Sequence, residues 1–181
     1  LEIVVGDDYS RTSAAIFGKY APEMISQAIS EDGKLMITIA RAEGVDWDPL
    51  KDLTAKAYGI LSEDFDMPPV KIFLEKTSPV GAGLGGGSAD ATAVIVAIND
   101  IFHLGLSKPQ LARLAAELGS DTAYFVYNDA ELCTGRGEIM SPIAVELAGR
   151  WLVVVKPDEG VSTAEAYRGV KPAMPERGLR E

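Results

Sequence analysis

A glycine-rich stretch from Pro79 to Ala93, PVGAGLGGGSADATA, limits most strongly what this chain can fold into. Five of its glycines fall within seven positions, and an apolar run, ATAVIVAINDIF, begins soon after them. Because glycine has no Cβ, consecutive backbone N–H groups can turn toward one point and approach a ligand closely. Where such a loop opens into a helix, the unpaired amides and the helix dipole favour an anion, most often phosphate. The pattern therefore predicts a phosphate-binding loop followed by a helix.

Three other interpretations of these glycines can be weighed on the sequence. A Walker loop would end in Gly-Lys-Ser/Thr, whereas Ser88 follows glycines with no lysine before it. A dinucleotide fingerprint GxGxxG fits over Gly81, Gly83 and Gly86, but Asp100 comes too early to be its acidic partner. A flexible linker is disfavoured because glycine-rich linkers are not normally followed by a long apolar run.

Composition narrows the class of protein. Of the 181 residues, 47% are hydrophobic and 24% are charged, which is ordinary for a globular protein. No apolar run reaches the roughly 20 residues that a membrane span needs. A net charge of −10 argues against nucleic acid or an anionic membrane as partner. The single cysteine, Cys133, cannot form an internal disulfide, which is compatible with a reducing cytoplasm.

Strand-like and helix-like runs are mixed without a regular alternation, which favours an α+β fold over a doubly wound sheet. Runs rich in β-formers predict strands at 1–5, 34–41, 70–76 and 151–156, the last of them in the core. In the third run, Lys71 and Glu75 are expected to point outward. Met140–Pro142 is expected to break the strands that precede the last run.

Apolar spacing predicts helices at 49–64, 88–102, 107–118 and 165–170. Ser107 is expected to cap the third of these, because Pro109 falls near its first turn and Gly119 ends it. The segment Thr12–Gly33 also has a helical pattern, and its role is left open.

Around the glycine-rich loop the sequence resembles the GHMP kinases, a family that includes galactose, homoserine, mevalonate and phosphomevalonate kinases. Most members have a shorter Gly-Leu-x-Ser-Ser-Ala loop. The longer GLGGGSAD at Gly83–Asp90 resembles one branch, the 4-diphosphocytidyl-2-C-methyl-D-erythritol kinases. Further matches follow in the expected order: LGSDTAYF at 118–125, TGRGEIMSPI at 134–143 and VVVKPDEGVSTAEAY at 153–167.

The resemblance implies a GHMP-kinase-like N-terminal domain with a mixed or antiparallel sheet covered by helices. It implies transfer of the γ-phosphoryl group of ATP, with Mg²⁺, to the 2-hydroxyl of 4-diphosphocytidyl-2-C-methyl-D-erythritol in non-mevalonate isoprenoid precursor biosynthesis. The partners would be ATP and this cytidine-containing small molecule, in the cytoplasm, and a homodimer is compatible with the interpretation. Two alternatives stay open: another GHMP kinase that acts on a sugar or small alcohol, and a nucleotide-binding module without catalysis.

Particular residues acquire roles from the resemblance. Asp121 in LGSDTAYF would be the catalytic base that accepts the proton of the substrate hydroxyl. Thr163 and Tyr167 would lie against the cytidine substrate, with the Tyr167 ring stacked on the pyrimidine; on spacing alone, Tyr167 would be a core residue. No residue is assigned to metal. ATP would be bound by Pro79, Gly81, Ala82, Gly83, Leu84, Gly85, Gly86, Gly87 and Ser88.

Several of the polar residues also have a structural interpretation. Asp121 could cap a helix that starts at Thr122, and Ser88 could cap the helix after the loop. Asp90 would lie in the first turn of that helix, where a carboxylate favours the dipole. Lys76 could neutralise phosphate, lie beside adenine, or be an exposed lysine at the end of a strand.

Asp52 departs from the branch, in which a nearby asparagine helps to bind adenine, so the adenine contacts stay open. Gly135 and Gly137 are expected to serve a turn between strands. His103, the single histidine, is expected to have a structural role, and Cys133 to be inert.

The resemblance also predicts how the chain is divided. Residues 1–150 would form the nucleotide-binding domain, and 151–181 would begin a substrate-side domain. The family has a lysine and a Tyr-His pair before the position of Leu1, and a second glycine-rich loop after that of Glu181. We therefore expect this chain to be the middle of a longer kinase.

Overall fold

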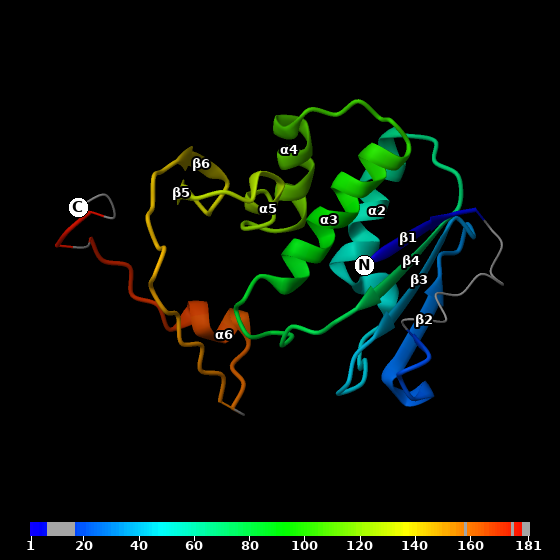
Figure 1. Ribbon diagram of the computed structural model, residues 1–181, viewed down its shortest axis with the longest axis horizontal. Coiled ribbons are helices and arrows are strands. Elements are labelled where there is room, and N and C mark those ends of the chain that lie inside the picture. The colour runs from blue at the N-terminus through cyan, green and yellow to red at the C-terminus, as the bar shows by residue number, and fades with distance from the viewer. Residues whose placement is uncertain (7–16, 158, 175, 179–181) are drawn as a thin grey trace.

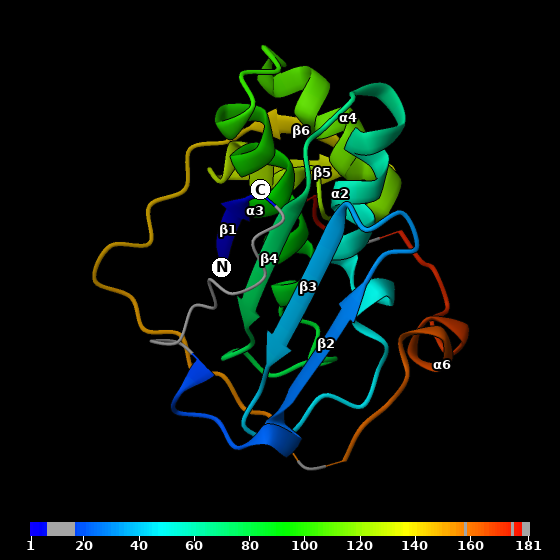
Figure 2. The ribbon, with the colours of Figure 1, turned by 90° about the vertical axis from the view of Figure 1, so that its right-hand side faces the viewer.

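The computed structural model describes residues 1–6, 17–157, 159–174 and 176–178. Its larger sheet has four strands, and they lie in the order β1-β4-β3-β2 (Figures 1 and 2). β3 and β4 are parallel, whereas β1 with β4 and β2 with β3 are antiparallel. The bounds are β1 (Glu2–Val5), β2 (Ile25–Ile29), β3 (Leu35–Ala40) and β4 (Val70–Glu75). This mixed sheet confirms the expected α+β class.

Helices cover one face of the sheet, and a two-stranded hairpin lies beyond them (Figure 1). The short 3-10 helices are η1 (Pro22–Met24) and η2 (Pro49–Lys51). The α-helices are α2 (Leu53–Asp64), α3 (Gly86–Ile101), α4 (Lys108–Leu118), α5 (Tyr124–Tyr127) and α6 (Thr163–Arg168), and the hairpin consists of β5 (Glu131–Thr134) and β6 (Ile139–Pro142). Within the described ranges, no helix is both long and apolar enough to cross a membrane.

The core lies between the sheet and helices α2, α3 and α4. Alternate residues of β3 and β4 face these helices, and they are fully buried. The cluster includes Ile37, Ile39, Ile72, Leu74, Leu61, Val94, Ile95 and Ile98. Burying this apolar surface holds β4 and α3 together, and the glycine-rich loop joins those two elements.

The other face of the sheet is covered as well, which corrects one prediction. Lys71 was expected to point outward, but it is only 1% exposed. Phe73 lies in β4, like Lys71, and the Phe17 ring packs on it with ring centroids 5.5 Å apart, so the chain before β2 covers this face. Alternation predicts which face a side chain takes, but it cannot show that a distant segment covers that face.

Two predictions of local structure near the ends of the chain are wrong. Thr12–Gly33 was expected to be helical, but Ile25–Ile29 forms β2 and pairs with β3; residues 12–16 lie outside the described ranges. Residues 151–156 were expected to form a core strand, but they form none, and Trp151 is 96% exposed. A strand takes its hydrogen bonds and its apolar contacts from a neighbour. Among the described residues, no strand pairs with 151–156.

Smaller differences concern element ends. Met140–Pro142 was expected to interrupt strands, but it belongs to β6, where Pro142 ends the two-stranded ladder opposite Glu131. The helix expected at 49–64 is divided into η2 and α2, because the Asp52 side chain accepts the Thr54 backbone N–H and caps α2. The predicted cap at Ser107 is confirmed, since the Gln110 side chain accepts the Ser107 N–H.

Candidate functional site

The glycine-rich loop is a series of turns between β4 and α3. Gly81, Gly83 and Gly85 have φ values of +68°, +72° and +69°, a region that side chains disfavour. Gly85 is also the N-cap of α3. A dinucleotide fold is wrong for this loop, because α3 leads to α4 and not to a further strand of the same sheet.

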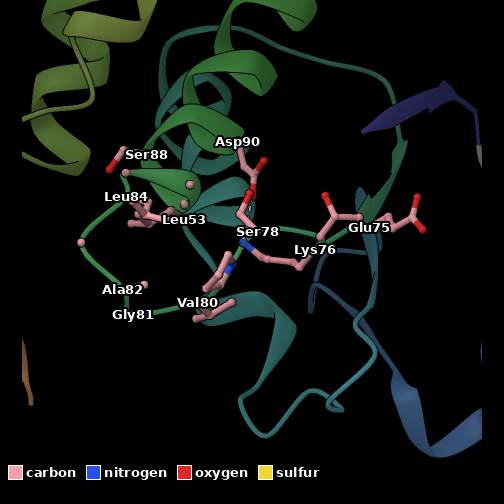
Figure 3. Close-up of a pocket in the computed structure, with 16 residues that line it drawn as sticks. Leu53, Glu75, Lys76, Ser78, Val80, Gly81, Ala82, Leu84, Ser88 and Asp90 are labelled. Atoms are coloured by element: carbon pink, nitrogen blue, oxygen red, sulfur yellow. Dashed lines mark hydrogen bonds and ion pairs between the residues drawn. The ribbon is translucent and has the colours of Figure 1, made fainter. Parts of the chain in front are cut away.

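The start of α3 presents backbone donors toward the loop. The first intrahelical bond runs from the Ala89 N–H to the Gly85 carbonyl oxygen, so the preceding amides have no acceptor within the helix. A cavity of about 360 Å³ lies against this end of α3 and against the whole loop from Pro79 to Gly87 (Figure 3). Glu75 and Lys76 line it from the end of β4, Asp90 lines it from α3, and Leu53 lines it from α2. This end of the helix can hold an anion of phosphate size.

Ser88 and Asp121 come together although 33 positions separate them. Ser88 Oγ donates a 2.9 Å hydrogen bond to Asp121 Oδ1. A Cβ at position 85 would lie 3.0 Å from the Phe125 ring, a tight contact, and 3.5 Å from Asp121 Oδ2, an ordinary one, so Gly85 allows the Phe125 ring to pack closely against the loop. Neither residue is the helix cap that the local sequence also allowed, because Gly85 caps α3 and Ala123 is the N-cap of α5.

Two threonines that the sequence did not single out hold the Asp121 loop in place. The buried Thr92 hydroxyl of α3 lies 2.8 Å from the Thr122 carbonyl oxygen and 3.0 Å from that of Ser88. The Thr122 hydroxyl donates to the Gly119 carbonyl oxygen at 2.7 Å. The sequence signal that could have indicated this role is the position of Thr92 in the apolar run of the helix, because a buried hydroxyl needs a hydrogen-bond partner.

Lys76 is neither free nor exposed. Its Nζ lies 3.1 Å from Asp52 Oδ2 and 3.1 Å from Asp90 Oδ2, and its side chain is 8% exposed. Asp52 Oδ2 also accepts the Trp47 indole N–H at 3.2 Å. Asp90 was expected in the first turn of α3, but the helix begins at Gly86, and Asp90 lies in the following turn, paired with Lys76. Because Asp52 caps α2 and Asp90 lies in α3, the cluster joins the end of β4 to both helices, and Figure 3 shows Lys76 and Asp90 beside the cavity.

Glu75 is the third charged residue that lines this cavity, beside Lys76 and Asp90. Its carboxylate accepts a 2.6 Å hydrogen bond from the Tyr20 hydroxyl and pairs with the Lys19 ammonium. The bonds from Lys19 and then Tyr20 hold the pKa of Glu75 below its ordinary value of 4.5. Glu75 is therefore a carboxylate at neutral pH, held by the segment that precedes β2.

Thr163 and Tyr167 both lie in α6. A second cavity, of about 470 Å³, lies between residues 80–84 of the glycine-rich loop and the C-terminal segment, and Tyr167 and Lys156 line it. Tyr167 is 75% exposed and is not a core residue. The loop thus borders one cavity toward β4 and another toward α6.

The remaining expectations concern turns and isolated polar residues. Gly135 and Gly137 form the turn between β5 and β6, as predicted. His103 follows α3 with a φ of +53°, in the turn that leads to α4. Cys133 on β5 is an exposed free thiol. Among the described residues, no group of three or more His, Cys, Asp or Glu side chains could hold a metal ion.

Known proteins resemble this chain in sequence and in fold. Residues 52–129 match the family model of the GHMP kinases N terminal domain. The 4-diphosphocytidyl-2-C-methyl-D-erythritol kinase of Bacteroides fragilis is 45% identical over 134 residues, which are 74% of this chain and 49% of that protein. The enzyme of the same name from Moorella thermoacetica is 46% identical over 119 residues, 66% of this chain and 41% of that protein.

One solved structure, a crystal structure of 4-(cytidine 5'-diphospho)-2C-methyl-D-erythritol kinase, matches with a TM-score of 0.50 and 28% identity. The matched region is 67% of this chain and 41% of the chain in that crystal structure. The chain spans about half the length of the curated relatives it matches. Helix α2, the glycine-rich loop, α3 and the Asp121 loop all fall within residues 52–129, the segment that matches the N-terminal domain of the GHMP kinases.

Proposed function

We propose that the whole protein transfers the γ-phosphoryl group of ATP to the 2-hydroxyl of 4-diphosphocytidyl-2-C-methyl-D-erythritol. The observation that carries the proposal is the Ser88–Asp121 hydrogen bond at the start of α3, because it brings a carboxylate beside the candidate phosphate loop. The names of the relatives support this particular acceptor, and the GHMP family supports ATP as donor.

The residues have separate tasks in this proposal. Gly81–Ser88 bind the ATP phosphates through the backbone N–H groups of the loop and of the start of α3, and Pro79, which has no N–H to donate, lines the same cavity. The Asp121 carboxylate accepts the proton of the acceptor hydroxyl. The acceptor oxygen then bonds to the γ-phosphorus, and the bond from that phosphorus to the β–γ bridging oxygen breaks, which releases ADP.

Mg²⁺ would enter together with the nucleotide. Ser88 Oγ and the Asp121 carboxylate are oxygen donors of the kind that Mg²⁺ takes along with phosphate oxygens, and we propose Ser88 as the residue that would hold the ion. When bound, the ion neutralises charge on the phosphates. Since the described residues form no cluster of three metal ligands, the nucleotide would supply the other ligands.

The acceptor would occupy the cavity beside α6. Tyr167 lines this cavity with an exposed ring, which supports stacking on the cytosine of the acceptor, and Thr163 lies in the same short helix. In this arrangement the glycine-rich loop borders both the nucleotide cavity and the acceptor cavity. We accordingly assign residues 1–150 to the nucleotide-binding domain and 151–181 to the start of the substrate-side domain.

A panel of acceptors tests the proposal in the full-length protein. With ATP and Mg²⁺, ³¹P NMR should show a new phosphomonoester on 4-diphosphocytidyl-2-C-methyl-D-erythritol and none on galactose, homoserine or mevalonate. Transfer to one of the other alcohols would favour a different GHMP kinase. ATP binding without transfer to any acceptor would favour a nucleotide-binding module.

A further inference from the structure

The turn between β5 and β6 touches the loop that carries Asp121. Gly137 in this turn has a φ of +122°, and a Cβ at its position would lie 2.7 Å from the Ser120 carbonyl oxygen and 3.4 Å from the Ser120 carbonyl carbon. Ser120 directly precedes Asp121. The two backbones are therefore in contact at a spacing that only glycine permits.

The turn is held firmly in its own right. The Gly137 N–H donates to the Thr134 carbonyl oxygen at 3.1 Å, and the Arg136 N–H donates to Glu138 Oε2 at 2.8 Å. Thr134 and Ile139 are paired in the ladder directly next to it. The β5–β6 ladder on one side of the turn and the bond to the Glu138 side chain within it together resist displacement of the turn.

The Asp121 loop is fixed from the opposite direction by α3. Thr92 contacts the Thr122 carbonyl oxygen, and Ser88 bonds to the Asp121 carboxylate. The three residues Ser120–Thr122 thus lie between α3 and the β5–β6 hairpin. Figure 1 shows α5 and the loop before it between these same two elements. Removing either support would let the carboxylate move relative to Ser88.

We propose that Gly137 is a positioning residue for Asp121: the β5–β6 turn, by its close contact with Ser120, sets the distance of the Asp121 carboxylate from Ser88 and the glycine-rich loop. This inference rests on the proposed function, in which Asp121 accepts the proton of the acceptor hydroxyl. Gly137 touches neither substrate; it acts through the backbone of Ser120.

Gly135 provides a matched control in the same turn. Its φ is +70°, so alanine there is also strained, but its Cβ would meet only the Glu138 side chain, at 2.9 Å. The end of the Glu138 side chain can shift by the small amount needed and keep its bond to the Arg136 N–H, whereas the Ser120 backbone at Gly137 cannot move without Asp121. Gly149, with a φ of +75° and open space around its Cβ, controls for backbone strain alone.

The experiment compares Gly137→Ala, Gly135→Ala and Gly149→Ala in the full-length protein with ATP, Mg²⁺ and the cytidine-containing acceptor. Gly137→Ala should lower kcat about tenfold to hundredfold, because a displacement near 1 Å has that effect on a reacting group. Its KM for ATP should stay within about twofold, since the phosphate loop is not touched. Both control variants should keep kcat within about threefold. Amide NMR signals of Ser120–Thr122 should shift in Gly137→Ala and not in Gly135→Ala.

A second variant covers the case in which Gly137→Ala does not fold. Glu138→Ala removes the acceptor of the Arg136 N–H and loosens the turn without adding volume, so it should lower kcat several-fold at unchanged KM for ATP. Normal kcat in the folded variants, or equal losses in Gly137→Ala and Gly135→Ala, would overturn the positioning role. Asp121→Ala is measured in parallel. If this variant keeps full turnover, the role of Asp121 as base is overturned as well. If Asp121→Ala loses turnover while the turn variants keep it, only the positioning role of Gly137 is overturned.

Discussion

At Gly85 two constraints act on one residue: a φ of +69°, and the Phe125 ring 3.0 Å from where a Cβ would be. Gly81 has nearly the same φ, +68°, with nothing within 4 Å of its Cβ position. Alanine at either position costs about 1–2 kcal/mol in backbone strain. Only at Gly85 would it also push Phe125, and with it the loop of Asp121.

We therefore expect Gly85→Ala to lower kcat of the full-length protein about tenfold more than Gly81→Ala does. Steady-state kinetics with both substrates measures this difference, and thermal unfolding of both variants checks that they lose similar stability. Equal kinetic effects would mean that the close contact at Gly85 does not matter for the position of Asp121.

Single residues also show where sequence reasoning reaches its limit. The glycine pattern was enough to predict the loop and the helix after it, because both depend on neighbouring residues. Ser88 and Asp121 were each singled out, yet both also looked like helix caps from their local sequence. Their hydrogen bond joins elements 33 positions apart, so neither its existence nor the support from Thr92 could be derived from local pattern.

Among elements, the Lys76 cluster connects the end of β4 to α2 and α3. Lys76→Met would leave the carboxylates of Asp52 and Asp90 without their cation, and Asp52 is 6% exposed. Loss of one partner from such a buried cluster typically costs about 3–5 kcal/mol. We expect urea denaturation of Lys76→Met to show a free energy of unfolding lower by about this amount.

Lys34→Met is the control for that experiment. Lys34 pairs with Asp66 at 2.9 Å, but the Asp66 side chain is 97% exposed, and such surface pairs contribute about 0–1 kcal/mol. If both lysine variants lose the same small amount of stability, the cluster does not hold the three elements together.

Elements were predictable where their own residues determine them. β3 and β4 are runs of β-formers buried in a sheet, and α4 has a recognisable start and end, so these were confirmed. β2 was missed, because ISQAI becomes a strand by pairing with β3. The opposite error at 151–156 has the same cause, since a run of β-formers makes no strand without a partner.

On the scale of the whole molecule, Glu75 ties the segment before β2 to the end of β4. Its folded pKa lies below the ordinary 4.5, so its ionised form stabilises the fold above about pH 4.5, and that contribution is lost as the pH falls through the folded pKa. Glu75→Gln should unfold at a lower temperature than the unmodified protein at pH 7, and the gap should close on acidification below 4.5. A gap that widens in acid would contradict the role of the carboxylate. In a Lys19→Met background the gap at pH 7 should be smaller.

The central claim is that Asp121, next to Ser88 and the glycine-rich loop, accepts the proton in phosphoryl transfer to a cytidine-containing alcohol. The most direct test measures ADP release by the full-length protein and by its Asp121→Ala variant, with ATP, Mg²⁺ and 4-diphosphocytidyl-2-C-methyl-D-erythritol. We predict turnover that requires this acceptor and falls at least about a hundredfold in the variant, with ATP binding retained. Turnover by Asp121→Ala at the unmodified rate, or ADP release that does not depend on the acceptor, would contradict the account.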